Sequence, residues 1–486
     1  MKAIRKTAPE ALAPVPFNIP QAFKTKLDNG LRVILFEDSR LPLVSYRLAF
    51  LTGDADDPAE AIGRTSAMAS MLMEGTLNYT SHQLAERIER IGASLSANAS
   101  NDFTAISAST LSLYRDEVLE LLGEIAFRPT FPESELDLYR RNAIEHLKFQ
   151  RSQANFLANE QAARLIYGEH PYSRISPTAA DIEKLDREGL IKYHAATLVP
   201  NRAMLIAIGD LDRESFLHQV NDQFGKWEKN ERPGTTFPPL PERASRTLTI
   251  VDRPGSAQAN IILANRSLDR LSPDYFSVLV MNQILGAGAS SRVFMNLREE
   301  KGYTYGAYTR VDAKMLAGDF EATAEVRTSV TGDSLKEFFY ELDRIRAEKA
   351  TEEELTDAKN FLTGVFPIRA ETQEGLTGLI VNQELYGLPD DYLQTYRDNV
   401  NAVTLDDVYA AANQYVLPDQ MAIVIVGDAD EVLPQARPYA SAIEIFDTEG
   451  HPIELAAAVG SKSDEPAAEV AGKWIILLDF QGQQVP

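Results

Sequence analysis

Ala203-Met-Leu-Ile-Ala-Ile-Gly-Asp210 and Met421-Ala-Ile-Val-Ile-Val-Gly-Asp428 are two copies of one pattern. A proline precedes each copy, and Pro200 and Pro418 are 218 residues apart. Each copy is a short apolar run closed by Gly-Asp, which predicts a buried strand that ends in a turn. A repeat at a fixed offset indicates an internal duplication, with two halves of about 220 residues.

Each half interleaves strands with helices, so we predict two homologous α+β domains. The first half is predicted to open with a hairpin over 23–38 that turns at Asp28-Asn29-Gly30. A strand over 44–51 and helices over 59–73 and 83–91 are predicted to follow. The second half repeats the order, with predicted strands at 247–252, 259–265, 303–311 and 317–327 and predicted helices at 274–285 and 292–300.

Composition shifts set the predicted boundaries. Residues 1–20 are rich in Ala and Pro and are expected to form an extended leader. Residues 21–230 form the predicted N-terminal domain, and 246–448 form the C-terminal one. The stretch 231–245 between them is proline-rich and is predicted to be a linker. Residues 449–486 are predicted to be a polar linker followed by one apolar strand at 474–480.

Charge and composition exclude several functions. The chain carries 48 Lys and Arg against 71 Asp and Glu, for a net charge of −23, which disfavours binding to nucleic-acid phosphates. It has no cysteine, so disulfides and thiol catalysis are excluded. No apolar run is long enough to span a membrane. We expect a soluble protein, cytoplasmic as the sequence is given, or periplasmic if a signal peptide was removed from its start.

Common catalytic motifs are absent from the sequence. There is no P-loop, and the glycines at 286 and 288 lack the spacing of a dinucleotide site. The chain has six histidines, and no two of them lie within twenty residues of each other. A motif that needs two histidines on adjacent helical turns is therefore missing.

Three stretches resemble the M16 metallopeptidases, the family of pitrilysin and the mitochondrial processing peptidase. They are Leu27-Asp-Asn-Gly-Leu-Arg-Val33, Gly168-Glu-His-Pro-Tyr172, and the run from Ser290 to Tyr305. The resemblance spans residues from about 20 to 445 and implies two α+β domains that form half of a clam-shell peptidase chamber.

The resemblance breaks at the zinc motif. Active members carry His-x-x-Glu-His, in which two imidazoles bind zinc and the glutamate is the general base. The aligned positions here hold Ser66, Ala69 and Ser70, and these side chains supply neither function. The third ligand of active members would fall near Glu145-His146, which cannot hold zinc alone. We expect no metal site and no bound cofactor in this chain.

The resemblance holds at a second set of positions. Active members use an Arg and a Tyr, seven residues apart, to contact substrate from the second half, and Arg298 and Tyr305 have that spacing. By this resemblance, Tyr305 would donate to the oxyanion and Arg298 would bind a substrate carbonyl or carboxylate. The run Gly286-Ala-Gly288-Ala-Ser290 matches a glycine-rich loop of the noncatalytic processing-peptidase subunit. It is either a substrate loop or an ordinary turn between helices.

These features predict the noncatalytic subunit of a bacterial M16B heterodimer. The chain would have no peptidase activity alone, and its partner would carry the His-x-x-Glu-His motif and the zinc. Peptides are the expected substrates. The alternatives are a structural core-type subunit of a larger complex and a peptide-binding or chaperone module without a peptidase partner.

Overall fold

The computed structural model describes residues 19, 21–230, 235–453, 478–480 and 483–485. The chain divides into two compact units between Pro452 and Ile453. Apart from Ile19, the predicted leader lies outside the described residues, and so do residues 231–234 of the predicted linker. Ile19 itself is buried in a hydrophobic cluster of the larger unit.

The smaller unit contains a short antiparallel pair. Strand β13 (Leu478–Phe480) pairs with β14 (Gln483–Val485), with Leu478 opposite Val485. The predicted tail strand covers 474–480, and its residues 474–477 lie outside the described residues.

The first half builds a six-stranded mixed sheet with the strand order β1-β2-β6-β3-β5-β4. Its hairpin turns at Gly30, whose φ of +94° favours glycine, as the sequence predicted. Its strands are β1 (Phe23–Lys26), β2 (Arg32–Glu37), β3 (Leu43–Phe50), β4 (Ser94–Ala99), β5 (Thr104–Leu111) and β6 (Ala203–Gly209).

The second half builds an equivalent sheet with the order β12-β7-β11-β8-β10-β9. Its strands are β7 (Thr247–Asp252), β8 (Gln258–Ser267), β9 (Thr304–Ala313), β10 (Gly318–Arg327), β11 (Ala422–Gly427) and β12 (Ala442–Phe446). Five of the six positions correspond, which confirms two homologous α+β halves. They differ at one edge, where β1 runs antiparallel to β2 but β12 runs parallel to β7.

The two copies of the opening sequence pattern are the central strands β6 and β11. Every residue of both strands is buried. Gly209 ends β6 with a φ of +139°, and a Cβ added there would lie 2.1 Å from the backbone oxygen of Leu43. The chain therefore needs glycine where β6 leaves the sheet.

Helices follow in the same order in both halves. The first half contains α1 (Arg64–Met71), α2 (Ser81–Arg90), α3 (Arg115–Phe127), α4 (Glu133–Arg151), α5 (Ala154–Tyr167), α6 (Ala179–Lys184), α7 (Arg187–Thr197) and α8 (Arg213–Phe224). The second contains α9 (Tyr275–Leu285), α10 (Arg292–Phe294), α11 (Thr331–Ala347), α12 (Glu352–Glu371), α13 (Gln373–Leu385), α14 (Tyr392–Ala402), α15 (Leu405–Tyr415) and α16 (Ala429–Ala436). The predicted helix 292–300 is instead a single turn, α10, followed by a π-helix over Met295–Glu300.

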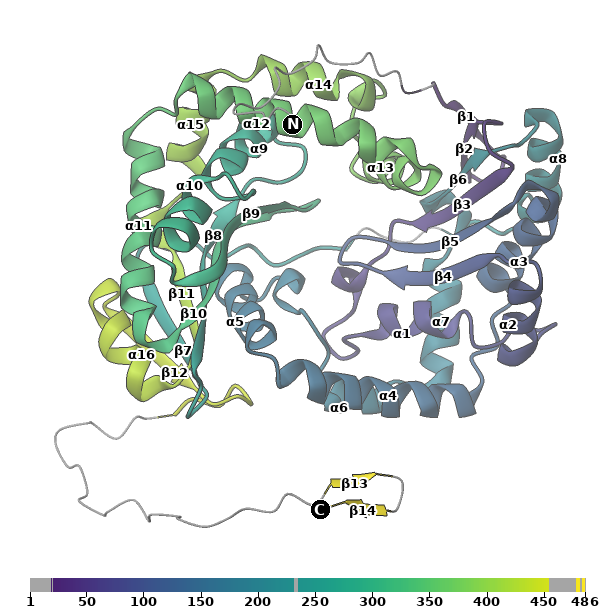
Figure 1. Ribbon diagram of the computed structural model, residues 1–486. Helices are drawn as coiled ribbons and strands as arrows, with labels where there is room; N and C mark the ends of the chain where they lie inside the picture. The colour runs from purple at the N-terminus through teal and green to yellow at the C-terminus, as the bar shows by residue number, and fades with distance from the viewer. Residues whose placement is uncertain (1–18, 20, 231–234, 454–477, 481–482, 486) are drawn as a thin grey trace. The chain divides into compact units, whose positions relative to one another are not determined.

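The halves exchange one helix each (Figure 1). Helix α5 of the first half packs on β8 and β11 of the second sheet, whereas α13 of the second half packs on β3 and β6 of the first. Ile380 and Val381 of α13 join one hydrophobic cluster with Ile206 of β6. Leu157 of α5 joins another with Val424 of β11. Each sheet is thus completed by the other half of the chain.

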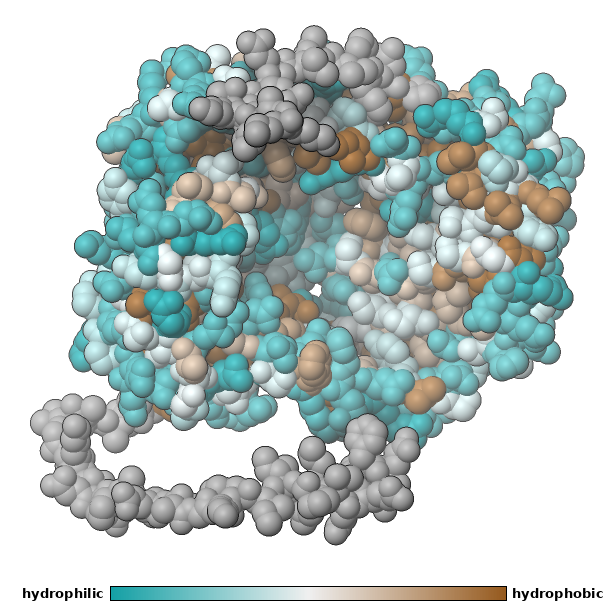
Figure 2. Space-filling model, viewed as in Figure 1, coloured by the Kyte–Doolittle hydropathy of each residue, from teal (hydrophilic) through white to brown (hydrophobic). Residues whose placement is uncertain are grey.

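Hydrophilic residues dominate the visible face of the larger unit, and hydrophobic residues are scattered across it in small groups (Figure 2). Among the described residues, no helix is long and apolar enough to cross a membrane.

Candidate functional site

The three zinc-motif positions all lie on α1, and each side chain contacts other groups of the same domain. Ser66 Oγ lies 2.9 and 2.8 Å from the two carboxylate oxygens of Asp54. Ala69 is 1% exposed and packs inside the domain. Ser70 Oγ donates to the backbone oxygen of Ser66 at 2.9 Å, one helical turn away.

Two carboxylates, the buried Asp57 and the half-buried Asp54, occupy the N-terminus of α1, and no local sequence pattern pointed to them. Gly63 is the N-cap and has no side chain to accept the first free N–H groups. The carboxylate of Asp57 accepts from the Thr65 N–H at 3.0 Å, and that of Asp54 accepts from the Ser66 N–H at 3.1 Å. Burial raises the pKa of Asp54, and it raises the pKa of Asp57 to about 7.

The residues around α1 do not fit a zinc ion. Glu145 and His146 lie on α4 with exposed side chains, and Glu145 pairs with Lys148 at 2.7 Å. Nowhere in the described parts of the chain do three or more His, Asp or Glu side chains gather closely enough to hold a metal. The Asp54 carboxylate points at the Ser66 hydroxyl and at a backbone N–H, so its oxygens already have donors.

Arg298 and Tyr305 lie close in the chain, at the free edge of the second sheet. Arg298 sits in the π-helix, with its guanidinium carbon 4.8 Å from the centre of the Phe294 ring. The chain then turns at Gly302, whose φ is +64°, and enters β9.

A β-bulge directs Tyr305 away from the sheet. The register of β9 on β10 shifts between Ala324 and Val326, so Tyr305 and Gly306 together face the single residue Glu325. Tyr305 is 91% exposed. A π-helix and a β-bulge, both frequent next to functional sites, thus flank this short stretch.

The glycine loop between α9 and α10 packs against the same strand. A Cβ added at Gly286 would lie 2.5 Å from the backbone nitrogen of Thr309, and the Thr309 N–H donates to the Gly286 oxygen at 2.9 Å. Gly288 lies against the amide of Gln283. Close approach explains Gly286, while contact of this loop with substrate stays a prediction.

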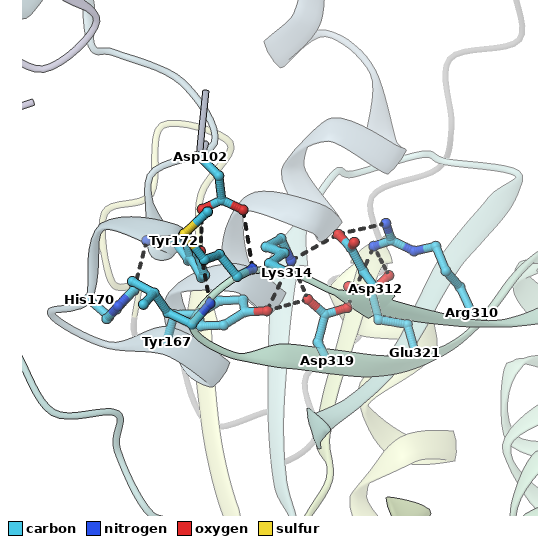
Figure 3. Close-up of polar contacts among 11 residues, drawn as sticks. Asp102, Tyr167, His170, Tyr172, Arg310, Asp312, Lys314, Asp319 and Glu321 are labelled. Atoms are coloured by element: carbon cyan, nitrogen blue, oxygen red, sulfur yellow. Dashed lines mark hydrogen bonds and ion pairs between the residues drawn. The ribbon is translucent and has the colours of Figure 1, made fainter. Parts of the chain in front are cut away.

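The Gly168-Glu-His-Pro-Tyr172 motif holds a buried polar network between the halves (Figure 3). The Tyr172 hydroxyl donates to Asp102 in the β4–β5 turn and accepts from the Leu316 N–H of the β9–β10 turn at 3.4 Å. The other oxygen of Asp102 accepts from the Met315 N–H at 3.2 Å. His170 caps the motif's own turn by accepting from the Tyr172 N–H.

The charged side chains of this network form ion pairs with one another. Lys314 Nζ lies 2.8 Å from Asp319, 2.9 Å from Asp312 and 3.0 Å from the Tyr167 hydroxyl. Burial lowers the pKa of Lys314, but the neighbouring carboxylates outweigh it and raise the pKa overall. Arg310 pairs with Glu321 at 2.7 Å on the same face.

The predicted site residues therefore form two separate sets. Ser66, Ala69 and Ser70 lie on α1 beside β4, whereas Arg298 and Tyr305 lie at β9 in the other half. Within the described residues, the hydrogen bonds and ion pairs of each set stay inside its own half.

Comparisons with known proteins agree with this architecture. Residues 32–175 match the family model described as "Insulinase (Peptidase family M16)", and residues 184–362 match "Peptidase M16 inactive domain". An "uncharacterized zinc protease YmxG" of Bacillus subtilis is 24% identical over 80% of this chain and 95% of its own length. A "non-peptidase homolog YmxG" of Helicobacter pylori is 23% identical over 77% of this chain and 87% of its own.

Solved structures share the fold. A peptidase M16 inactive domain from Pseudomonas fluorescens superposes with a TM-score of 0.79 at 26% identity and covers 84% of this chain and 98% of its own. A protease from Helicobacter pylori gives a TM-score of 0.78 at 19% identity, with 84% and 100% coverage. Two M16 family models match in tandem over residues 32–175 and 184–362, and the fold consists of two homologous α+β halves, so the chain belongs to peptidase family M16.

Proposed function

We propose that the chain is the noncatalytic subunit of a heterodimeric M16 peptidase. The exposed Tyr305, at a bulge of β9 seven residues after Arg298, is the observation that carries this proposal. The α1 positions that would bind metal in an active relative are instead occupied by Ser66 and Ser70, and the position of the general base is occupied by Ala69. A partner chain with an intact zinc motif would complete the active site.

The roles of the two residues follow from their chemistry. When water attacks a peptide carbonyl, negative charge develops on the carbonyl oxygen, and the Tyr305 hydroxyl would donate a hydrogen bond to it. The Arg298 guanidinium would hold a substrate carbonyl or carboxylate before the reaction. It forms an ion pair with the exposed Glu299 at 3.4 Å, but the Arg298 side chain is 45% exposed, so the cation stays accessible to a ligand.

Peptide binding fits the sheet edges. Strand β4 pairs only with β5, and β9 pairs only with β10, among the residues the structure describes. An extended peptide can add to such an edge through backbone hydrogen bonds, which suits recognition of many sequences.

The test is peptide hydrolysis by the chain co-expressed with a His-x-x-Glu-His partner. Loss of one oxyanion donor costs about 10²–10³ in turnover, so Tyr305→Phe should lower kcat by that factor. Arg298→Ala should also raise KM, because it removes a contact made before chemistry. Tyr308→Phe is the matched control, since Tyr308 is an exposed tyrosine on the same strand.

Assembly is followed by gel filtration in parallel. Wild-type kinetics in both Tyr305→Phe and Arg298→Ala, with an intact complex, would leave the chain as a scaffold. Absence of any complex with a zinc-binding partner would favour the structural-subunit or peptide-binding alternative.

A further inference from the structure

A cavity of about 780 Å³, lined mostly by polar residues, lies on the first sheet between its outer strands and the start of α13. Helix α13 packs on β3 and β6, and on this face β5 contributes Ala105 to the same hydrophobic cluster, whereas Ser107 and Ser109 of β5 and the neighbouring β4 line the cavity. The cavity floor is therefore made by side chains of β3, β5 and β4. Its volume is within the range of ligand pockets.

The floor is built from rows of small hydroxyl side chains that run across the sheet. Ser45, Ser109 and Ser94 are opposite one another on the three strands. The next row is Arg47, Ser107 and Ser96. Since Ser94 and Ser96 belong to β4, both rows lead to the free edge where a peptide strand could add.

Arg47 is the one cation of this floor, and it lacks a carboxylate partner among the described residues. Its Nε–H donates to Ser107 Oγ at 3.0 Å, so the half-buried side chain leans from β3 toward the free edge. Neither terminal nitrogen of the guanidinium has a protein partner within the described part of the chain. Burial lowers the pKa of Arg47, and the exposed Glu374 at the rim opposes this without an ion pair.

The other cation at the cavity is already neutralised. Arg40 donates to both carboxylate oxygens of Asp38, at 2.8 and 2.7 Å. On the corresponding face of the second sheet, the cation Arg310 is likewise paired with a carboxylate, that of Glu321. Arg47 thus differs from both in presenting open donors to a cavity.

We propose that this cavity binds the carboxylate of a peptide added to the free edge of β4, with Arg47 as its anchor. The inference rests on the proposed peptide-binding function and names its substrate class, peptides with an acidic group. Adjacent strands lie about 4.8 Å apart, so a strand added beside β4 would lie about 14 Å from β3. An acidic side chain of the peptide would reach across Ser96 of β4, and the Arg47 side chain reaches across Ser107 of β5. Together they would span the distance between the added strand and β3.

The experiment measures binding of fluorescent seven-residue peptides to the purified full chain by anisotropy. One probe has a central glutamate among Val and Thr and is blocked at both ends. A second replaces the glutamate with glutamine, and a third keeps the glutamine but has a free C-terminal carboxylate. Binding of the first or third probe above the second identifies a side-chain or a terminal carboxylate, respectively.

Arg47→Gln should weaken binding of the preferred acidic probe by about tenfold or more and leave the glutamine probe unchanged. Arg40→Gln is the matched control and should have no effect. Ser96→Leu, at an exposed position of β4, should also weaken the acidic probe because it blocks the path from the edge to Arg47. This second variant keeps the test decisive if Arg47→Gln does not fold.

Equal affinity for all three probes, no binding of any probe, or equal effects of Arg47→Gln and Arg40→Gln would overturn the proposal. The proposed function is judged separately, by hydrolysis in the heterodimer. Hydrolysis that depends on Tyr305 but not on Arg47 or an acidic group would retain the subunit role and reject this pocket. Binding that depends on the acidic group of the peptide, by a chain that supports no hydrolysis, would retain this pocket and reject the subunit role.

Discussion

The two sheets share strand order and an exchanged covering helix, yet their open faces differ in chemistry. The face on β3, β5 and β4 carries serines and the unpaired Arg47. The corresponding face on β9 and β10 carries Arg310, Asp312, Asp319 and Glu321, which pair with one another and with Lys314. The charged side chains on the second sheet form ion pairs with one another, whereas Arg47 on the first sheet has no ion-pair partner among the described residues.

This difference shows which positions of a duplicated fold are free to diverge. The central strands β6 and β11 are buried on both sides, so both copies remain Ala, Ile, Val, Leu, Met and Gly. On one face of the outer strand pairs, polar side chains that line cavities replace the apolar core, so apolar packing dictates the residue less. Binding chemistry can therefore change there without loss of the fold.

The largest contrast between the faces should appear in stability. Asp319 is 5% exposed at its side chain and contacts both Lys314 and Tyr167. Asp319→Ala leaves Lys314 with a weakened set of partners in a buried site, so we expect a loss of about 3–5 kcal/mol in the free energy of unfolding. Arg47→Ala breaks no ion pair and should cost under about 1 kcal/mol. Urea denaturation measures both, and equal losses would contradict the comparison.

The link between the faces gives a smaller expected effect. Tyr172→Phe removes the hydroxyl that bonds Asp102 of the first half and the Leu316 N–H of the second. Because Asp102 then loses a donor in a mostly buried place, we expect a cost of about 1–3 kcal/mol. Hydrogen exchange should show faster exchange at Met315 and Leu316. Tyr308→Phe serves as the control, and unchanged exchange in Tyr172→Phe would refute the link.

The smallest expected effect concerns the helix that follows the inner strand in each half. Helix α1 is capped by the buried Asp57, whereas the corresponding α9 has Asp274 at its N-cap without a side-chain cap bond. The folded pKa of Asp57 is raised to about 7 from an ordinary value of 3.8. Because the folded state holds this proton more tightly than the unfolded state, protonation of Asp57 adds to the free energy of unfolding. This contribution is complete below about pH 4 and is lost as the pH rises through about 7.

Asp57→Asn removes this titration. We expect the wild type to lose on the order of 1 kcal/mol more stability than Asp57→Asn between pH 5 and pH 8. Melting temperatures across that range provide the measurement. Glu145→Gln, a change at an exposed carboxyl, should leave the wild-type profile intact. Parallel profiles for wild type and Asp57→Asn would show that Asp57 is ionised in the fold.

Local sequence signals predicted the repeated parts of the fold and not its long-range contacts. The Gly-Asp repeat located β6 and β11, and Asp28-Asn29-Gly30 located the turn between β1 and β2. The exchange of α5 and α13 has no local signal, because an apolar helix face does not state which sheet it covers. The network of Asp102, Lys314 and Asp319 joins residues more than two hundred positions apart, and the bulge at Tyr305 depends on the pairing of β9 with β10.

Because each half contributes a helix to the other half's sheet, the single chain has the topology of an intertwined dimer whose two subunits are covalently joined. In a dimer of this kind, each partner donates an element that the other needs, and separation would bare two apolar sheet faces at once. The described part of the segment between the halves adds to this cohesion, because Phe237 and Leu240 pack against the cluster that contains Leu157 of α5. A chain cut there would be expected to remain a single particle, held by α5 and α13.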